Sequence, residues 1–352
     1  MNISELNPGH LTQVKAAYTT RHVAFDAITT VLSGDLTPQI GDLVLARVEL
    51  IGQHKHIELA TGRKASLFPG DEVVVCYGNR YAPDQFEAEI PQDLSPCHLV
   101  AAGGLAAQVL SQHVKMNFPT AITPIGLLGD SNGQRLNLSD RALQPTSYIG
   151  QRPFTIAVVG TSMNSGKTTT AAHLIKGLVL AGLKVGAAKI TGTGAGGDIW
   201  LMRDAGASPV LDFTYAGFPS TYQATPMQVQ RILATLTSHL AAEGVDVIVL
   251  EIADGLYQDE TSWLVSSLAF RQTVDGVVFA TACALGAAAG VEWLQRYQLP
   301  VLAISGLVTA SPLAAREAAK ATGLPVLDME MLRAGAGNII SGFYRSQMAL
   351  SV

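Results

Sequence analysis

The pattern of hydrophobic and polar positions changes near residue 150. Before this point, apolar and polar residues alternate in short runs at 42–50, 56–61, 64–68 and 72–78, and turn-forming residues separate the runs. Alternation over a few residues is typical of half-buried strands. The pattern therefore predicts a small β-rich domain, such as a barrel, over residues 1–150.

Three other stretches of this first part have different patterns. Residues 10–32 have apolar side chains at helical spacing and predict a helix. Residues 97–114 predict a strand followed by a helix, with Gly103 and Gly104 at the junction. Tight packing explains this glycine pair better than a second anion site, because a lone Gly-Gly is weak evidence. The loop-rich residues 127–153 predict a connection to the second part.

Beyond residue 150, continuous apolar runs alternate with segments of helical periodicity. The runs lie at 154–160, 184–190, 208–213, 246–252, 275–280, 300–305 and 324–328. The helical segments 225–244 and 311–323 each begin with Thr-Pro or Ser-Pro and end at glycine. Strands buried on both faces that alternate with helices form parallel sheets. Residues 151–352 are therefore predicted to form an α/β domain with a doubly wound, mostly parallel sheet, whose ligands bind at the carboxyl ends of the strands.

Composition narrows the class of protein. Of the 352 residues, 48% are hydrophobic and 14% are charged, which favours a compact fold over disorder. The net charge of -5 gives no electrostatic argument for a nucleic acid partner. Residues 1–10 lack the pattern of a signal peptide, and the least polar window, 276–291, is too short for a membrane span. We expect a cytoplasmic protein without a membrane or nucleic acid partner.

The three cysteines, Cys76, Cys97 and Cys283, have neither metal-site nor redox spacing, and we expect free thiols. Cys283 follows a predicted strand and is interpreted as a small buried residue.

The stretch GTSMNSGKTTT, residues 160–170, carries the strongest functional signal. It lies between a predicted strand and a predicted helix, where backbone amides and a helix N-terminus bind anions. Lys167 is expected to reach the outer phosphates of a nucleotide, and the Thr168 hydroxyl to bind Mg²⁺. The usual loop has four residues between its first glycine and the Gly-Lys pair, whereas Gly160 and Gly166 enclose five.

This loop resembles that of dethiobiotin synthetases, in which Gly-Thr and Val-Gly-Lys-Thr have the same interval. Those enzymes belong to the SIMIBI class of P-loop proteins, which also contains an adaptor of molybdenum-cofactor biosynthesis. A family of D-glutamate N-acetyltransferase-like proteins has a similar loop. The resemblance covers residues 153–330, about half of the chain. It implies that Thr161 replaces the usual first glycine. The implied nucleotide-binding residues are Thr161, Ser162, Asn164, Ser165, Gly166, Lys167, Thr168 and Thr169.

The resemblance also implies three residues around the phosphates. Lys189 ends an apolar run and matches the family lysine that contacts phosphate or a substrate carboxylate; an ordinary surface lysine is the alternative. Asp198 follows a glycine-rich stretch, as does the family aspartate that binds Mg²⁺, and it is also a candidate helix N-cap. Glu251 matches the family glutamate that binds Mg²⁺. A carboxylate at the end of a buried strand needs a cation, and a metal shared with Thr168 provides one.

The residues after Glu251 depart from the resemblance. The synthetases read Glu-Gly-x-Gly-Gly, and this chain reads Glu-Ile-Ala-Asp-Gly. Gly255 matches, whereas Ile252 and Asp254 differ, which leaves the substrate open. Asp254 could join the metal shell, orient water or bind a substrate ammonium group. The candidate catalytic residues are Lys167, Lys189 and Asp254.

Two main classes of function are compatible with these residues, and a third is less favoured. The first is an enzyme that uses Mg²⁺ and ATP, with GTP as the alternative, to transfer a phosphoryl group to a small-molecule carboxylate before ligation. The second is a nucleotide-binding adaptor or slow NTPase that serves a partner protein. An acyltransferase of the D-glutamate type is a third. A homodimer is compatible with all three, although Thr161 and Ser162 stand where dimeric switch relatives have an extra lysine.

Residues of the remaining turns have less specific interpretations. Arg80 and Tyr81 are candidate substrate contacts or simply an exposed hairpin end, and the loop 214–225 either closes over substrate or is an ordinary surface loop. His54 and His56 would need further ligands to form a metal site.

Overall fold

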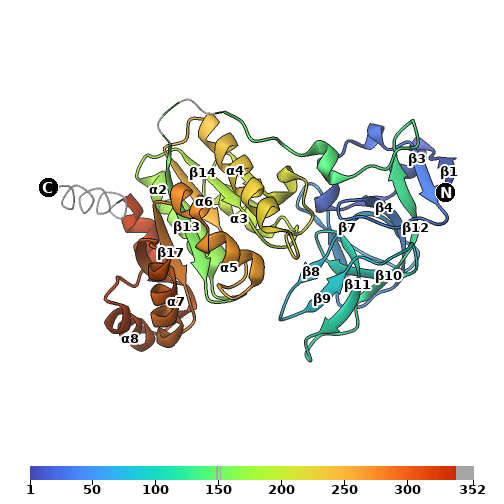
Figure 1. Cartoon of the computed structure of the whole chain (residues 1–352). Coiled ribbons are helices and arrows are strands. Elements are labelled where there is room, and N and C mark those ends of the chain that lie inside the picture. The colour runs from blue at the N-terminus through green and yellow to red at the C-terminus, as the bar shows by residue number, and fades with distance from the viewer. Residues whose placement is uncertain (148–149, 151, 338–352) are drawn as a thin grey trace. The chain divides into compact units, whose positions relative to one another are not determined.

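The computed structural model describes residues 1–147, 150 and 152–337. Contacts divide the chain into two compact units, which Figure 1 shows in blue to green and in green to red. The first unit comprises Met1–Gln144 together with the short segments Gly192–Gly197 and Phe213–Gln223. The rest of the chain forms the second unit. The sequence suggested a single boundary at residue 150. The structure differs from this division because the two short segments, which lie beyond residue 150, belong to the first unit.

The first unit consists of strands and short helical turns. Its strands are β1 (Asn2–Glu5), β2 (Lys15–Ala16), β3 (Thr30–Ser33), β4 (Leu43–Leu50), β5 (His56–Glu58), β6 (Lys64–Ser66), β7 (Glu72–Tyr77), β8 (Arg80–Tyr81), β9 (Phe86–Glu89), β10 (Cys97–Ala101), β11 (Leu105–Gln112) and β12 (Thr120–Gly129). Its helical parts are α1 (Pro8–Leu11) and 3₁₀ turns at Tyr18–Thr20, Phe25–Ala27, Leu138–Arg141 and Phe213–Ala216.

Five of the described strands close into a ring. β12 pairs with β4, β4 with β7, β7 with β11, β11 with β10, and β10 again with β12. The β7–β11 pair is parallel and the other pairs are antiparallel. Alternate side chains such as Val44, Val75 and Leu99 share one buried apolar core. The β-rich first domain predicted from the alternating runs is confirmed, and it contains a barrel.

Two helices predicted in this unit are wrong. Of the helix expected over residues 10–32, only the start is helical, because α1 ends at Leu11. Beyond it, the Ala17 amide donates to the carbonyl of Val74 in β7. Pairing with the barrel thus replaces intrahelical hydrogen bonds, although the apolar spacing was helical. The helix expected within 97–114 is strand β11. Gly104, at φ +97°, forms the tight turn that joins β10 to β11.

The second unit alternates strands and helices. Its strands are β13 (Phe154–Gly160), β14 (Val185–Lys189), β15 (Val210–Asp212), β16 (Val247–Glu251), β17 (Gly276–Ala280) and β18 (Val301–Ser305). Its helices are α2 (Lys167–Leu180), α3 (Gly197–Asp204, whose first residue belongs to the first unit), α4 (Pro226–Ala242), α5 (Asp259–Ser266), α6 (Leu268–Thr273), α7 (Ala284–Arg296) and α8 (Pro312–Thr322), with a 3₁₀ turn at Leu307–Ala310.

The six strands form one parallel sheet in the order β15-β14-β16-β13-β17-β18. Val185 and Ala187 of β14 pack in the same core as Ile175 of α2. A side chain at Gly186 would instead meet Leu240 of α4. Helices therefore cover both faces of the sheet, as Figure 1 shows, and the predicted doubly wound parallel sheet is confirmed.

The helix boundaries follow the predicted caps. The Thr225 hydroxyl and the Gln228 side chain form a capping box at the start of α4, and Ser311 caps α8, which ends at Gly323 with φ +69°. The strand expected at 324–328 is wrong, because the chain there makes only an isolated bridge to β18.

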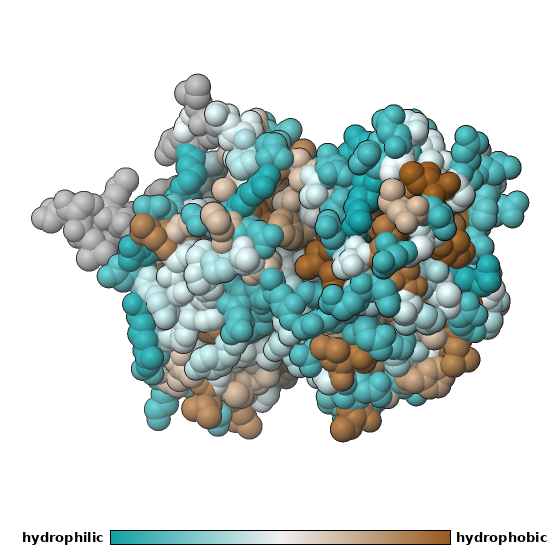
Figure 2. Space-filling view, turned by 45° about the vertical axis from the view of Figure 1, so that its right-hand side comes forward, coloured by the Kyte–Doolittle hydropathy of each residue, from teal (hydrophilic) through white to brown (hydrophobic). Residues whose placement is uncertain are grey.

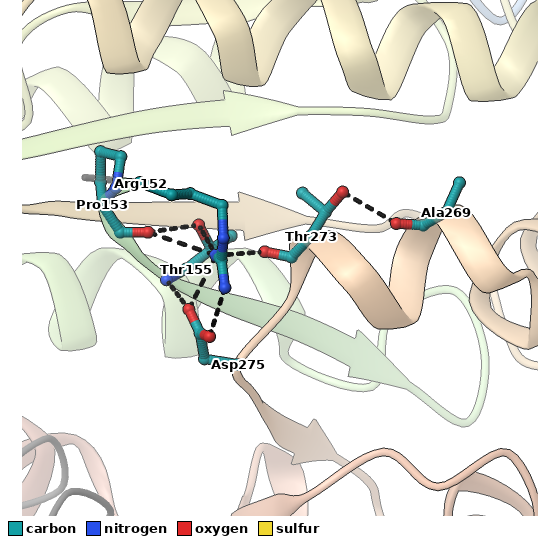
Figure 3. A network of polar contacts seen from close by, with 6 residues as sticks. All are labelled: Arg152, Pro153, Thr155, Ala269, Thr273 and Asp275. Carbon is teal, nitrogen blue, oxygen red and sulfur yellow. Dashed lines mark hydrogen bonds and ion pairs between the residues drawn. The ribbon is translucent and has the colours of Figure 1, made fainter. Parts of the chain in front are cut away.

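An ion pair joins the amino ends of β13 and β17, whereas the predicted site lies at the carboxyl ends of the strands (Figure 3). The Asp275 carboxylate accepts hydrogen bonds from two nitrogens of Arg152, at 2.9 and 2.5 Å, and from the Thr155 amide at 2.7 Å. Arg152 also donates to the carbonyl oxygen of Thr273 at 2.7 Å. A bidentate pair that also satisfies backbone groups contributes more than a simple surface pair.

Apolar side chains also occur on the surface. On the face shown in Figure 2, hydrophilic and intermediate residues separate several hydrophobic patches. Exposed apolar side chains include Phe68, Val114, Met227 and Leu285. None of the helices in the described ranges has the length and hydropathy needed to cross a bilayer.

Asp275→Ala is expected to lower the free energy of unfolding by about 1–2 kcal/mol, because it leaves Arg152 and the Thr155 amide without their acceptor. Chemical denaturation measures this loss. Glu292→Ala is the control, since the Glu292–Arg296 pair lies on the surface, is screened by solvent and should contribute much less. Equal losses in the two variants would contradict the structural role of Asp275.

His54 is a partly buried imidazole in the first unit. Its ring centroid lies 5.9 Å from that of Phe86, and its Nδ1 atom is buried with no hydrogen-bond partner among the described residues. Burial, and then the positive charge of Arg80, lower the pKa of His54 to about 4. His56 is exposed, and the described residues contain no group of three His, Cys, Asp or Glu side chains suited to a metal ion.

The lowered pKa of His54 predicts a pH-dependent stability. Between pH 6.5 and about 4 the unfolded chain binds a proton at this position and the folded chain does not, so the free energy of unfolding falls as the pH falls. We expect a loss of about 3 kcal/mol over this window that is absent from His54→Gln. Urea denaturation at several pH values tests this. If both proteins lose the same stability, His54 is not the group responsible.

Candidate functional site

β13 passes through a short loop into α2. A Cβ atom at Gly160 would lie 2.4 Å from the Ser165 hydroxyl and 2.9 Å from the Ala280 carbonyl oxygen, so the loop folds closely over the strand end. Asn164 and Gly166, with φ of 63° and 97°, have left-handed backbones that turn the chain into the helix. The first-turn amides of α2 have no acceptor within their own helix. The loop therefore presents amides suited to an anion.

Neighbouring turns hold this loop from three sides. The Thr161 amide donates to the carbonyl of Ala280, at the end of β17, at 3.0 Å. A Cβ atom at Gly255, after β16, would lie 2.2 Å from the Thr161 carbonyl oxygen. One at Gly306, after β18, would lie 2.3 Å from the Ser165 carbonyl oxygen. Glycines at the ends of two strands thus allow backbone to pack directly on backbone.

Lys167 begins α2 and lies under the loop. Its side chain is nearly buried, with 6% of the residue exposed, and its ammonium donates to the Ser162 carbonyl oxygen at 2.8 Å. Burial lowers the pKa of Lys167, and the negative charges of Glu251 and Asp254 oppose this effect. An ammonium placed inside the loop can bind a phosphate oxygen there.

Glu251 ends β16, between β13 and β14, and its residue is only 2% exposed. Its Oε1 atom accepts a hydrogen bond from the Thr168 hydroxyl at 2.8 Å, and its buried Oε2 atom has no hydrogen-bond partner among the described residues. Burial, and then the charge of Asp198, raise the pKa of Glu251 to about 7. Such a carboxylate is poised to accept a cation.

Lys189 ends β14 directly beside Glu251 in the sheet. It is 8% exposed and forms an ion pair with Asp198, so it is not an ordinary surface lysine. Burial disfavours its charge, but Asp198 and Glu251 outweigh burial and raise the pKa of Lys189. Burial likewise opposes ionisation of Asp198, and the Lys189 ammonium overcomes it and lowers the pKa of Asp198.

The structure places Asp198 in the first turn of α3, since the helix begins at Gly197. Asp254 lies in the turn after β16 with φ of 65°, and its residue is buried. The charge of Asp254 raises the pKa of Lys167 and Lys189. One cluster within the second unit thus contains Lys167, Thr168, Lys189, Asp198, Glu251 and Asp254.

The oxygen atoms of Thr168, Asp198 and Glu251 fit a magnesium ion. Hydroxyl and carboxylate oxygens are the ligands that Mg²⁺ prefers, and it usually completes its shell with water and phosphate oxygens. The Oε2 atom of Glu251 has no hydrogen-bond partner in the part of the chain that the structure describes, and a metal would satisfy this acceptor.

Two features near the loop differ from the expectations or escaped them. Cys283 is exposed rather than buried, and its sulfur accepts a hydrogen bond from the Gly286 amide at the start of α7. Ser305, at the end of β18, accepts from the Thr170 hydroxyl at 3.3 Å and donates to the Leu327 carbonyl at 2.7 Å. In the sequence, the position of Ser305 at the end of the strand is marked by Gly306, which directly follows it.

The glycine-rich residues before Asp198 belong to the first unit. The Gly192 amide donates to the Thr221 hydroxyl at 2.8 Å, and the Gly196 amide to the buried Glu58 carboxylate at 2.9 Å. Gly194 packs against the Pro219 carbonyl. Specific hydrogen bonds therefore fix this glycine-rich stretch.

Arg80, a candidate substrate contact, is buried in the first unit. Its guanidinium donates to the Val100 carbonyl oxygen and to Gln85 Oε1. It therefore holds the β8–β9 turn and is not an exposed hairpin end.

Comparison with known proteins does not assign this chain to a family. No protein-family model and no curated protein matches it. It is similar to the solved signal recognition particle 54 kDa protein of Aeropyrum pernix K1 in complex with GDP, with 21% identity over 60% of this chain and 53% of that one and a TM-score of 0.38. Two further solved structures are also similar: the signal recognition particle receptor FtsY of Elizabethkingia anophelis (18% identity, 59% of this chain and 75% of that one, TM-score 0.36) and chloroplast FtsY of Physcomitrella patens (16% identity, 56% and 70%, TM-score 0.35). This chain spans about half the length of the Aeropyrum protein. TM-scores this low establish neither nucleotide nor activity.

Gly255→Ala is expected to destabilise the protein by about 1–3 kcal/mol, because the added methyl group would overlap the Thr161 carbonyl. Thermal or urea unfolding measures the effect. Gly335→Ala is the matched control, since nothing lies within 4 Å of a Cβ atom there. A Gly255→Ala protein as stable as the control would show that the turn after β16 does not pack on the loop.

Proposed function

We propose that the second unit binds a nucleoside triphosphate with Mg²⁺ and transfers its γ-phosphoryl group to an oxygen of a small molecule, such as a carboxylate. The observation that carries this proposal is the convergence of two buried lysines and three oxygen-bearing side chains beside one anion-binding loop. Phosphoryl transfer requires positioning and charge stabilisation more than covalent participation, and these groups supply both.

The loop residues divide into two roles. The Thr161 amide is bonded to Ala280, so Thr161 anchors the loop. We assign the phosphate contacts to Ser162, Asn164, Ser165, Gly166 and the first turn of α2 through Thr169, of which the Ser165 hydroxyl is buried without a hydrogen-bond partner among the described residues. Lys167 would leave the Ser162 carbonyl to bind an outer phosphate oxygen.

The remaining cluster would manage charge at the transferring group. Mg²⁺, when bound by Thr168, Asp198 and Glu251, supplies charge neutralisation at the phosphates. Lys189 would bind a phosphate oxygen or the acceptor carboxylate, once Asp198 turns to the metal. Asp254 lies close enough to act electrostatically on both lysines, and we assign it the orientation of the acceptor.

Lys167→Ala is expected to weaken binding of ATP and GTP by a factor on the order of 10–100, because one charge-assisted contact to phosphate is lost. Isothermal titration calorimetry with both nucleotides measures this and identifies the preferred base. Lys176→Ala is the matched control, an exposed lysine of the same helix. Unchanged affinity in Lys167→Ala would place the nucleotide elsewhere.

Glu251→Gln separates the metal from the nucleotide. In the wild type, Mg²⁺ should raise the affinity for ATP or GTP, and in Glu251→Gln most of this gain should be lost because an amide is a poor substitute for a carboxylate ligand. Binding without Mg²⁺ should change little. An undiminished Mg²⁺ effect would remove Glu251 from the metal site.

Release of nucleoside diphosphate in the presence of small carboxylic acids and amines tests the transfer itself. Strong stimulation by one compound is the expected result. Tight nucleotide binding with negligible turnover under every condition would contradict transfer and favour an adaptor that serves a partner protein. Binding of an acyl-CoA in place of a triphosphate, with release of free CoA, would favour the acyltransferase.

A further inference from the structure

A cavity of about 310 Å³ lies in the first unit, beside β8, β9 and β11. The residues that matter for its chemistry are Tyr81, Gln85, Glu87, Ser111, His113 and Tyr222. A volume of this size is at the lower end of the range for small-molecule sites. The cavity therefore suits a ligand of few non-hydrogen atoms.

Two tyrosines form one wall of the cavity. The rings of Tyr81 and Tyr222 lie with centroids 5.6 Å apart and planes at 45°. Hydrogen bonds fix the neighbours of Tyr222 on both sides: Thr221 accepts from the Gly192 amide at 2.8 Å, and the Gln223 amide group donates to Glu89 at 2.6 Å. The aromatic wall is thus positioned by the structure around it.

A carboxylate lies beside this wall. Glu87 accepts a hydrogen bond from the Ser111 hydroxyl at 2.7 Å and one from the Tyr222 hydroxyl at 3.4 Å. Burial, and then the negative charge of Glu87, raise the pKa of Tyr222, with a further contribution from Glu89. The Glu87 carboxylate is therefore an acceptor at the wall of the cavity, beside the Tyr222 ring.

Arg80 precedes Tyr81 in β8, and two hydrogen bonds of its guanidinium go to groups other than Glu87. Arg80 directs its guanidinium to the Val100 carbonyl and to Gln85. Among the residues that line the cavity, none is a lysine or an arginine. Aromatic faces beside a carboxylate are a combination that attracts organic cations.

We propose that this cavity binds a small organic cation, a primary ammonium or guanidinium group on a short carbon chain. Glu87 would pair with the charge, and the faces of Tyr81 and Tyr222 would contact the cation and its chain. The Glu87 carboxylate would repel an anionic ligand. A neutral apolar ligand would bury this carboxylate without a partner, which costs free energy. This site is separate from the nucleotide site proposed for the second unit and does not depend on it.

Calorimetric titration of the full chain with agmatine and with butylammonium tests the proposal, with 1-butanol and butyrate as neutral and anionic probes of similar length. At least one of the two cations should bind with one-to-one stoichiometry and a dissociation constant below about 10 mM. Both control probes should fail to bind. Absence of binding by both cations, or equal binding of butanol or butyrate, would overturn the proposal.

Variants locate the site. Glu87→Gln should weaken cation binding by about tenfold or more, whereas Glu49→Gln, an exposed glutamate of β4, should leave it unchanged. Tyr222→Leu should weaken binding and Tyr222→Phe should retain most of it, because the ring face is preserved. Unfolding curves verify that each variant is folded. Unchanged binding in both Glu87→Gln and Tyr222→Leu would overturn the assignment.

Lys167→Ala distinguishes the cation site from the nucleotide site. It should bind the cation as the wild type does, since Lys167 belongs to the other unit. Loss of cation binding in Lys167→Ala would contradict the independence of the cavity from the nucleotide site.

Discussion

The buried carboxylate of Glu251 is the constraint on which the candidate site depends. It ends a central strand, is almost inaccessible to water, and has one oxygen bonded to the Thr168 hydroxyl and the other without a hydrogen-bond partner among the described residues. A group in this position is costly when charged unless cations surround it. Lys167 and Lys189 provide two, and the oxygen donors around Thr168 and Asp198 provide a place for a third. The two lysines therefore lie where they compensate the buried negative charge of Glu251.

The parallel sheet makes this convergence possible. The carboxyl ends of β13, β14 and β16 lie side by side, so residues far apart in sequence, such as Lys167, Lys189 and Glu251, meet at one edge. Glycines after β16 and β18 let backbone pack directly against the loop. The opposite edge carries a structural ion pair instead. The structural ion pair and the candidate site therefore lie at opposite ends of the same strands.

Local patterns predicted the second unit well because its elements are defined by their own periodicity and caps. The first unit was harder, since Ala17 and its neighbours pair with a distant strand and β11 begins at a glycine turn, and neither pairing is visible in local spacing. At the candidate site, strand ends predicted the positions of Lys189 and Glu251. The ion pair of Lys189 with Asp198, the burial of both lysines and the membership of residues 213–223 in the first unit depend on tertiary contacts that no short motif encodes.

A crystal structure of the protein with Mg²⁺ and a non-hydrolysable triphosphate tests the central claim most directly. The account predicts that the phosphates occupy the loop after β13, with Lys167 on an outer phosphate and the metal bound by Thr168 with carboxylate oxygens of Asp198 and Glu251. Phosphates outside this loop, or a metal held away from Glu251, would contradict it.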